Sequence, residues 1–120
     1  MNSEDSIKKL VHEFATNVVK QNESIFVHDP NRGNEHAREY IKAFRQLRAF
    51  GPKGLDALAT LLDDERKDVR TMAACFLLRH KTEAALEVLK KSAEEKGLDG
   101  LGAFMTLKRW ESGTWNLDSI

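Results

Sequence analysis

The residues that most often carry chemistry at neutral pH are dispersed in this sequence. No metal-site spacing links the four histidines, which are His12, His28, His36 and His80. The single cysteine, Cys75, precedes His80 by five residues, a spacing that separates two side chains by about 140° on a helix. We therefore predict neither a metal site nor a Cys–His nucleophile, and we expect Cys75 to be a small core residue.

A cluster of acidic residues is the next candidate for chemistry. Its carboxylates lack the alternating spacing and the glycine of a calcium-binding loop. They precede a predicted helix, whose positive dipole end favours acids. We interpret the cluster as a solvated loop with Arg66, Lys67 and Arg70 as counter-charges. Its members are Asp63, Asp64, Glu65 and Asp68.

The glycines do not form a phosphate-binding loop. Gly97, Gly100 and Gly102 have the wrong spacing for either nucleotide motif and follow a predicted helix instead of a strand. A serine nucleophile motif is also missing from the sequence. The sequence therefore predicts that the protein is not an enzyme and that it binds no cofactor or metal.

A basic segment is the strongest binding signal. Residues 32 to 53 hold six Lys or Arg side chains against two Glu, a surplus of four positive charges. Arg38, Lys42 and Arg45 lie at i, i+4 and i+7, so they share one face of a predicted helix. Such a face is suited to contacting the phosphates of nucleic acid or the carboxylates of an acidic protein.

The same segment has a simpler interpretation. Glu35 and Glu39 are spaced to pair with Arg38 and Lys42, which would leave an ordinary solvated helix face. The formal net charge of the whole chain is zero, with 19 acidic and 19 basic residues. A dedicated nucleic-acid-binding protein usually carries a positive excess. We therefore rank nucleic acid second among partners.

The two tryptophans are expected to differ. Trp110 lies in the last predicted helix and should anchor it in the core. Trp115 lies in a tail without periodicity, so two roles stay open for it. It folds back as a cap over the terminal helix pair, or it anchors an interface with a partner.

The whole-chain properties bound the fold. A chain of 120 residues with 41% apolar and 32% charged residues is typical of a single soluble globular domain. One cysteine cannot form an internal disulfide, and the charged N-terminal region resembles neither a signal peptide nor a membrane span. We expect a cytoplasmic protein without membrane contact.

Apolar residues recur with helical periodicity along most of the chain. We predict an all-α fold, a short HEAT-like α-solenoid of about five to six antiparallel helices in a right-handed superhelix. Residues 22–30 are ambiguous, and Asp29-Pro30-Asn31 is expected to be a turn. The parts are an N-terminal helix and connector (1–30), a first helical hairpin (34–62), a second (67–95), a terminal helix (101–113) and a tail (114–120).

Residues 58–93 resemble a HEAT-like repeat of the PBS-lyase type. The resemblance rests on Leu61-Leu62 before the acidic loop, then Val69-Arg70, then Ala73-Ala74. It implies that Arg70 reaches carbonyls or acids in the inter-helix turn, and that the alanine pair lets helices touch. Where such repeats often have an Asp as helix cap, this sequence has Arg66, so capping would fall to Glu65 or Asp68.

Residues 5–113 also resemble a family of small bacterial HEAT-like proteins catalogued only as a domain of unknown function. The further signals are Leu47-Arg48 before Gly51, and the segment from Thr106 to Gly113 with the pattern Thr-Leu-x-x-Trp-x-x-Gly. This resemblance implies a fold and a bacterial origin, and it implies no activity.

Three functions follow in order. The first is non-catalytic protein–protein interaction, for example by an immunity or regulatory protein that sequesters a partner. The second is nucleic-acid binding through the basic helix face, and the third is a self-associating structural protein. For the oligomeric state we expect a monomer or a weak homo-oligomer. The candidate partner-binding residues are Arg38, Lys42, Arg45 and Trp115, and the structural ones are Arg70, Ala73, Ala74 and Trp110.

Overall fold

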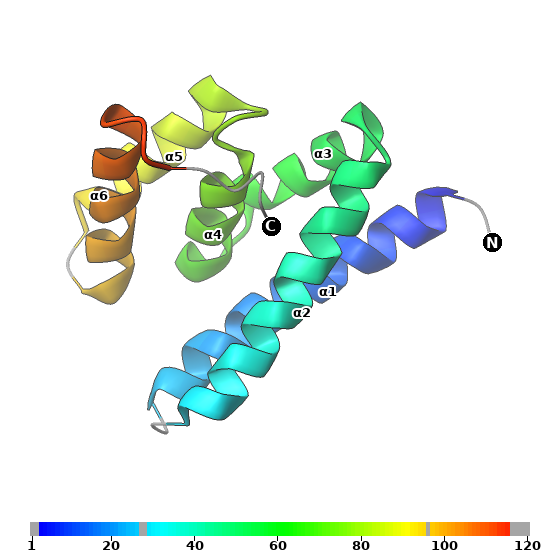
Figure 1. The fold of residues 1–120 in the computed structure, drawn as a ribbon, viewed down its shortest axis with the longest axis horizontal. Helices are drawn as coiled ribbons and strands as arrows, with labels where there is room; N and C mark the ends of the chain where they lie inside the picture. The colour runs from blue at the N-terminus through cyan, green and yellow to red at the C-terminus, as the bar shows by residue number, and fades with distance from the viewer. Residues whose placement is uncertain (1–2, 27–28, 96, 116–120) are drawn as a thin grey trace. The chain divides into compact units, whose positions relative to one another are not determined.

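The computed structural model describes residues 3–26, 29–95 and 97–115, which form helices and no β-strand. The prediction of an all-α fold is confirmed. None of the described helices is long and apolar enough to cross a membrane. The elements in order are α1 (Ser3–Phe26), α2 (Pro30–Ala49), α3 (Pro52–Ala59), the 3-10 helix η1 (Thr60–Asp63), α4 (Lys67–Leu77), α5 (Thr82–Ala93) and α6 (Leu98–Glu111) (Figure 1).

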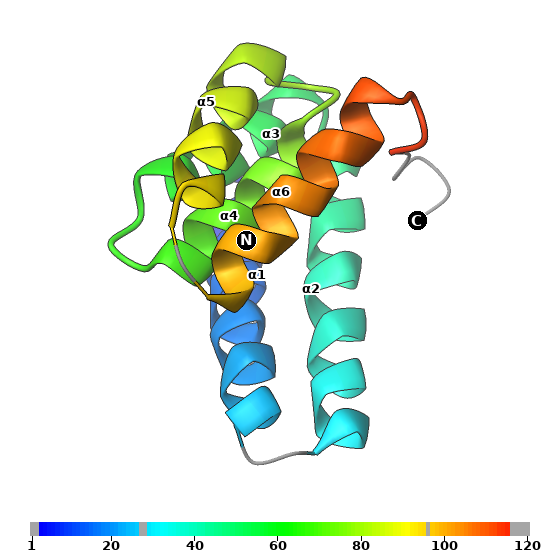
Figure 2. The same ribbon diagram turned by 90° about the vertical axis from the view of Figure 1, so that its left-hand side faces the viewer.

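The chain divides into two compact units, residues 1–60 and 61–120. Unit 1 is built on a hairpin of its two long helices, α1 and α2, which lie side by side (Figure 2). Each helix buries a stripe of apolar side chains against the other. At the centre, the rings of Phe14 and Tyr40 meet edge to face, with centroids 5.6 Å apart. The fully buried side chains of the hairpin include Phe14, Val18, Phe44 and Leu47.

The connection between α1 and α2 differs from the predicted turn. Helix α1 continues through Phe26, whereas Val27 and His28 of the ambiguous stretch lie outside the described residues. Helix α2 begins at residue 30 instead of 34, because Asp29 caps it and Pro30 occupies its first turn. The Asp29 carboxylate accepts a hydrogen bond from the backbone N–H of Arg32 at 3.1 Å. The Asp-Pro signal therefore marks a helix start.

The start of helix α3 lies close to the end of α2. Gly51 caps α3 with a left-handed φ of 75°, a conformation that other residues rarely adopt. Three residues later, Gly54 lies against the backbone of Leu47, and a Cβ built there would be 1.9 Å from the Leu47 carbonyl oxygen. This glycine pair turns the chain and lets α3 pack tightly.

Unit 2 is arranged around α4, which buries eight of its eleven residues. Both α5 and α6 pack against it. The hydroxyls of Thr71 and Ser92 are 2.9 Å apart and link α4 to α5. The Cys75 sulfur lies 3.6 Å from the Thr106 hydroxyl and links α4 to α6. The core of unit 2 thus contains polar pairs that fix which residues face each other.

The glycine arrangement of unit 1 recurs in unit 2. Gly97 caps α6 with a φ of 102°, and α6 starts at residue 98 instead of the predicted 101. A Cβ built on Gly100 would be 1.9 Å from the Glu95 carbonyl oxygen. The predicted loop between Gly97 and Gly100 is therefore the first turn of α6.

The start of α4 lacks the predicted side-chain cap. Arg66 occupies the cap position, and neither Glu65 nor Asp68 caps the helix from outside. Asp68 lies inside the first turn, where it accepts two hydrogen bonds from the Arg66 guanidinium, at 3.0 and 2.9 Å. It also accepts one from the backbone N–H of Val69 at 2.9 Å. Asp68 therefore satisfies one backbone N–H of the first turn from a position two residues after the cap.

Candidate functional site

The basic row, defined here as Arg38, Lys42 and Arg45, lies on the exposed outer face of α2. Helix geometry places the three side chains within about 60° of one another and about half a turn from the buried Tyr40 and Leu47. Within the described residues, none of the three forms an ion pair or hydrogen bond. Their charges are therefore available to a partner.

The ion pairs expected to neutralise this face are not formed. Glu35 and Glu39 are exposed on α2, and in the described part of the chain they pair with neither Arg38 nor Lys42. An exposed i, i+3 pair gains at most about 0.5 kcal/mol, which does not compensate for ordering two long side chains.

Helix α6 carries an exposed apolar stripe that the sequence analysis missed. Leu101, Phe104 and Met105 are 55%, 48% and 48% exposed and lie at i, i+3 and i+4. The inward face of the same helix holds the smaller Ala103 and Thr106, which are buried. The sequence contains a signal of this arrangement. The larger apolar residues Leu101, Phe104 and Met105 share one side of the helix, and the smaller Ala103 and Thr106 lie on another.

The apolar stripe has a charged border. The Lys108 ammonium lies 5.4 Å from the centre of the Phe104 ring, a cation–π distance. Lys108 also approaches the Glu111 carboxylate at 3.8 Å, and both side chains are exposed. Arg109 is exposed beside them. An apolar centre with a polar border is the usual composition of a protein-binding patch.

The tryptophans lie in unit 2, at and beyond the end of α6. Trp110 is partly buried and does not belong to the fully buried core, because it lies in the last turn of the helix. The Trp115 indole N–H donates to the carbonyl oxygen of Cys75 at 3.2 Å, and its backbone N–H donates to that of Arg109 at 3.1 Å. Trp115 is thus engaged within unit 2, and residues 116–120 of the predicted tail lie outside the described residues.

The residues with expected structural roles lie in α4. The Arg70 guanidinium donates to the carbonyl oxygens of Asp64 and Glu65 at 2.7 and 3.0 Å. This is the type of contact that the HEAT-like resemblance implies for it. Ala73 and Ala74 are completely buried in the helix that both α5 and α6 contact.

Cys75, which was considered as a nucleophile, is a buried free cysteine in α4. Burial raises the pKa of the Cys75 thiol, and a hydrogen bond with Thr106 only partly opposes this effect. A neutral buried thiol is a poor nucleophile. No group of three or more His, Cys, Asp or Glu side chains that could hold a metal occurs among the described residues. His28 lies outside them.

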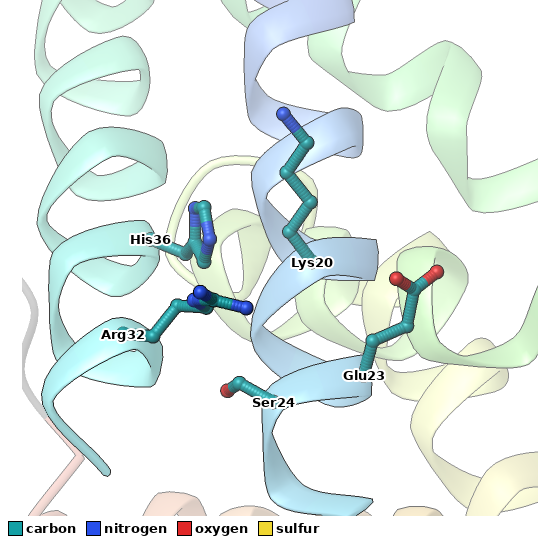
Figure 3. Close-up of a pocket in the computed structure, with 5 residues that line it drawn as sticks. All are labelled: Lys20, Glu23, Ser24, Arg32 and His36. Atoms are coloured by element: carbon teal, nitrogen blue, oxygen red, sulfur yellow. The ribbon is translucent and has the colours of Figure 1, made fainter. Parts of the chain in front are cut away.

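A pocket lined by polar and charged residues lies in the α1–α2 hairpin of unit 1 and has a volume of about 380 Å³. Figure 3 shows Arg32 and His36 extending from α2 toward α1. The sequence analysis missed this pocket because its residues are distant in sequence and meet only when the two helices pair. Its lining residues are Lys20, Glu23, Ser24, Arg32 and His36.

Comparison with known proteins gives a likeness in fold. No protein-family model matches the sequence, and no curated protein matches it either. The structure is similar to the crystal structure of the protein RPA1889 from Rhodopseudomonas palustris CGA009, with a TM-score of 0.85 and 23% sequence identity. The likeness covers 92% of this chain and 92% of that chain. At this level of identity the likeness establishes a shared fold and leaves function to the surfaces described above.

Proposed function

We propose that this protein is a non-catalytic, HEAT-like solenoid module that binds another protein through the apolar stripe of α6. The observation that carries the proposal is the exposure of Leu101, Phe104 and Met105 on one helix face. Full burial of such a side chain contributes about 1.5 to 3 kcal/mol, and about half of each remains to be gained here. The stripe therefore offers a few kcal/mol of binding free energy in a small area.

The border of the stripe indicates the chemistry of the partner. Lys108 and Arg109 are exposed at its edge, so a partner with an apolar pocket bordered by carboxylates fits it best. Aromatic and Arg residues are the side chains that most often dominate interface energies. A partner that buries Phe104 would bury apolar surface and would also bring its carboxylates close to Lys108. An immunity or regulatory protein that sequesters its target would act in this way.

The HEAT-like part of the proposal is supported by contacts in unit 2. The Arg70 bonds to carbonyls in the turn before α4 agree with the role such repeats give to this arginine. The buried Ala73 and Ala74 agree with close helix packing. A solenoid unit of this kind displays wide surfaces whose exposed residues change without disturbing the core.

The test compares a variant of the apolar stripe on α6 with a variant of the basic row on α2. Tagged wild-type protein, Leu101→Ser/Phe104→Ser and the control Arg38→Gln/Arg45→Gln are used to capture proteins from host extract, with nuclease added in parallel. We expect one protein that survives nuclease, binds the wild type and the control equally, and is lost with the α6 variant. Equal capture by all three proteins would reject the α6 stripe as the binding surface.

A second candidate function is nucleic-acid binding through the basic row. The observation in its favour is that Arg38, Lys42 and Arg45 are exposed without partners among the described residues. Binding of labelled duplex DNA and single-stranded RNA would be followed by fluorescence anisotropy over a range of salt. Arg38→Glu/Arg45→Glu should abolish binding, whereas Lys90→Glu/Lys91→Glu, with the same charge change on α5, should retain it. No binding at low salt would exclude this function.

A further inference from the structure

The pocket in the α1–α2 hairpin has an excess of positive charge. Lys20 and Arg32 bring two positive charges to the pocket, and Glu23 is the one carboxylate among its described lining residues. In the described part of the chain, Lys20 and Glu23 form no hydrogen bond or ion pair. In Figure 3 the Glu23 carboxylate points away from Arg32 and His36. Among the described residues, Lys20 therefore has no ion-pair partner, and Arg32 has only a long contact with Asp29 outside the pocket lining.

Arg32 is only weakly held by its neighbour. Its Nε lies 3.7 Å from the carboxylate of Asp29, which is too long for a hydrogen bond, and both side chains are largely exposed. Asp29 is already engaged as the cap of α2. The guanidinium thus has donors available for a ligand on the α1 side of α2, toward which it extends (Figure 3).

The pocket floor is fixed by a close contact between the helices. Ser24 is 4% exposed, and its hydroxyl donates to the Gln21 carbonyl oxygen at 2.6 Å. A Cβ built on Gly33 would lie 2.8 Å from the Ser24 hydroxyl oxygen, so the glycine permits this approach. The backbones of α1 and α2 therefore approach closely at this end of the hairpin.

The orientation of His36 is determined by a chain of hydrogen bonds. The Asn17 side-chain N–H₂ donates to the Glu13 carbonyl oxygen at 2.8 Å, so the Asn17 amide oxygen is the atom that faces His36. That oxygen can only accept, so Nδ1 of His36 carries a proton and donates to it at 3.0 Å. Nε2 is then the ring nitrogen left for a ligand, and in this tautomer it accepts a hydrogen bond.

We propose that the α1–α2 pocket binds a phosphorylated small molecule, whose phosphate is held by Lys20 and Arg32 beside the ring of His36. An ammonium and a guanidinium match the charge and the several acceptor oxygens of a phosphate dianion. The pocket volume of about 380 Å³ is within the range of small-molecule sites, about 300 to 1,000 Å³, so it also accommodates an organic part. Glu23 accepts hydrogen bonds from hydroxyl groups of that part, which points to a sugar phosphate.

This site is independent of the proposed protein-binding function. The pocket lies within unit 1, whereas the apolar stripe lies on α6 of unit 2. It is also distinct from the basic row, because His36 and Arg38 are separated by about 160° around α2. Failure of either binding test therefore leaves the other unaffected.

The first experiment is an NMR titration of the full chain with glucose 6-phosphate, inorganic phosphate and glucose at constant ionic strength. We expect saturable shifts of the backbone amides of Ser24 and Arg32 with glucose 6-phosphate, weaker ones with phosphate, and none with glucose. Arg32→Gln should weaken binding by about tenfold, the usual effect of losing a charge-assisted hydrogen bond. The control Lys42→Gln, with the same charge change on the outer face of α2, should bind as the wild type does.

Two results would overturn the site. One is the absence of saturable shifts with both phosphate compounds. The other is equal weakening by Arg32→Gln and Lys42→Gln, which would show attraction to net charge without a pocket. Circular dichroism of each variant establishes that the helices are intact, since Arg32 and Lys42 are both exposed.

The second experiment tests the role of His36. Binding of glucose 6-phosphate to His36→Gln is compared with binding to the wild type at a single pH. We expect the variant to bind several-fold more weakly, because it lacks the ring whose orientation is set by Asn17. Equal affinity of the two proteins would reject the role of His36.

Discussion

The two units contain similar numbers of residues but bury their polar groups differently. In unit 1, α1 and α2 are long and carry polar contacts along their seam, such as Tyr40 with Gln21 at 3.1 Å and His36 with Asn17. In unit 2, the helices are shorter, and α4 is almost completely enclosed. The difference indicates which surface of each unit is available to a ligand or a partner. A long hairpin leaves a polar pocket and an outer charged face, whereas an enclosed central helix moves the accessible apolar surface to α6.

The units nevertheless share one device. In each, the third helix starts with two glycines three residues apart, Gly51 and Gly54 in unit 1 and Gly97 and Gly100 in unit 2. The first glycine of each pair has a positive φ, and the second approaches a backbone carbonyl. The common requirement is a sharp turn followed by close packing of the third helix. The predictions below test how strongly the stability of each unit depends on its glycine pair and on the contacts that the other unit lacks.

The largest effect is expected at the second glycine of each pair. Gly54→Ala and Gly100→Ala would each place a Cβ 1.9 Å from a backbone oxygen, so helix and partner must separate. We expect each variant to lower the free energy of unfolding by about 3 kcal/mol. Urea denaturation followed by circular dichroism measures this loss.

The matched control for these variants is Gly102→Ala. Gly102 is exposed in α6 and has nothing within 4 Å of a built Cβ. The alanine should therefore stabilise the protein by about 1 kcal/mol through its helix propensity. A loss at Gly54 without a comparable loss at Gly100 would show that the two third helices are packed by different means.

A smaller effect distinguishes the polar contacts of the two units. Thr71→Val in unit 2 removes a buried partner of Ser92 and should cost about 2 kcal/mol. Tyr40→Phe in unit 1 removes a hydrogen bond to the partly exposed Gln21, to which water has access, and should cost about 1 kcal/mol. Denaturant unfolding of both variants gives the comparison.

The double variant Thr71→Val/Ser92→Ala sharpens this result. Removal of both hydroxyls leaves no unsatisfied polar group, so part of the lost stability should return. If Tyr40→Phe were the more costly change, the polar seam of unit 1 would be the more important of the two.

The pH dependence of unit 2 is expected to show a further, smaller difference. Burial raises the pKa of the Cys75 thiol, so the folded state keeps the proton where the unfolded chain has released it. Stability should therefore fall as the pH rises above about 8.5, the ordinary value for cysteine. Urea unfolding of wild type and Cys75→Ala at about pH 7 and about pH 10 isolates the thiol from other titrating groups. Identical losses in both proteins would contradict the assignment.

The smallest effects are expected on the two exposed faces. Arg45→Gln on the basic row and Leu101→Ser on α6 remove side chains without a buried partner. Each should change the free energy of unfolding by no more than about 0.5 kcal/mol. Thermal denaturation measures this directly. A larger loss for Leu101→Ser would mean that the stripe serves the fold of unit 2 and is not reserved for a partner.

The sequence allowed the helices to be predicted because apolar residues recur with helical spacing, as at Ile7, Leu10, Phe14 and Val18. These four residues are buried as that spacing requires. Helix starts were less predictable, since the same residues serve turns and caps. Asp29-Pro30 begins a helix where a turn was expected, and Arg66 occupies the cap position of α4 where Glu65 or Asp68 was expected to cap the helix.

The binding surfaces were only partly predictable. The basic row follows from spacing on a single helix, so Arg38, Lys42 and Arg45 could be assigned to one face. The pocket brings Lys20 and Arg32 together across a helix pair, and no local pattern reports such a contact. The apolar stripe of α6 depends on which side of the helix meets α4, and Ala103 and Thr106 decide that by size and fit.

The hydrogen bond from the Trp115 indole to the Cys75 carbonyl oxygen links synthesis of the chain to completion of unit 2. Cys75 is in the last turn of α4, where carbonyl groups lack a partner within the helix. One of these acceptors is satisfied by a residue 40 positions later. During translation, therefore, α4 emerges with an open end that water must solvate until residue 115 has left the ribosome. The helix at the centre of unit 2 is among the first parts of that unit to be made and among the last to be finished.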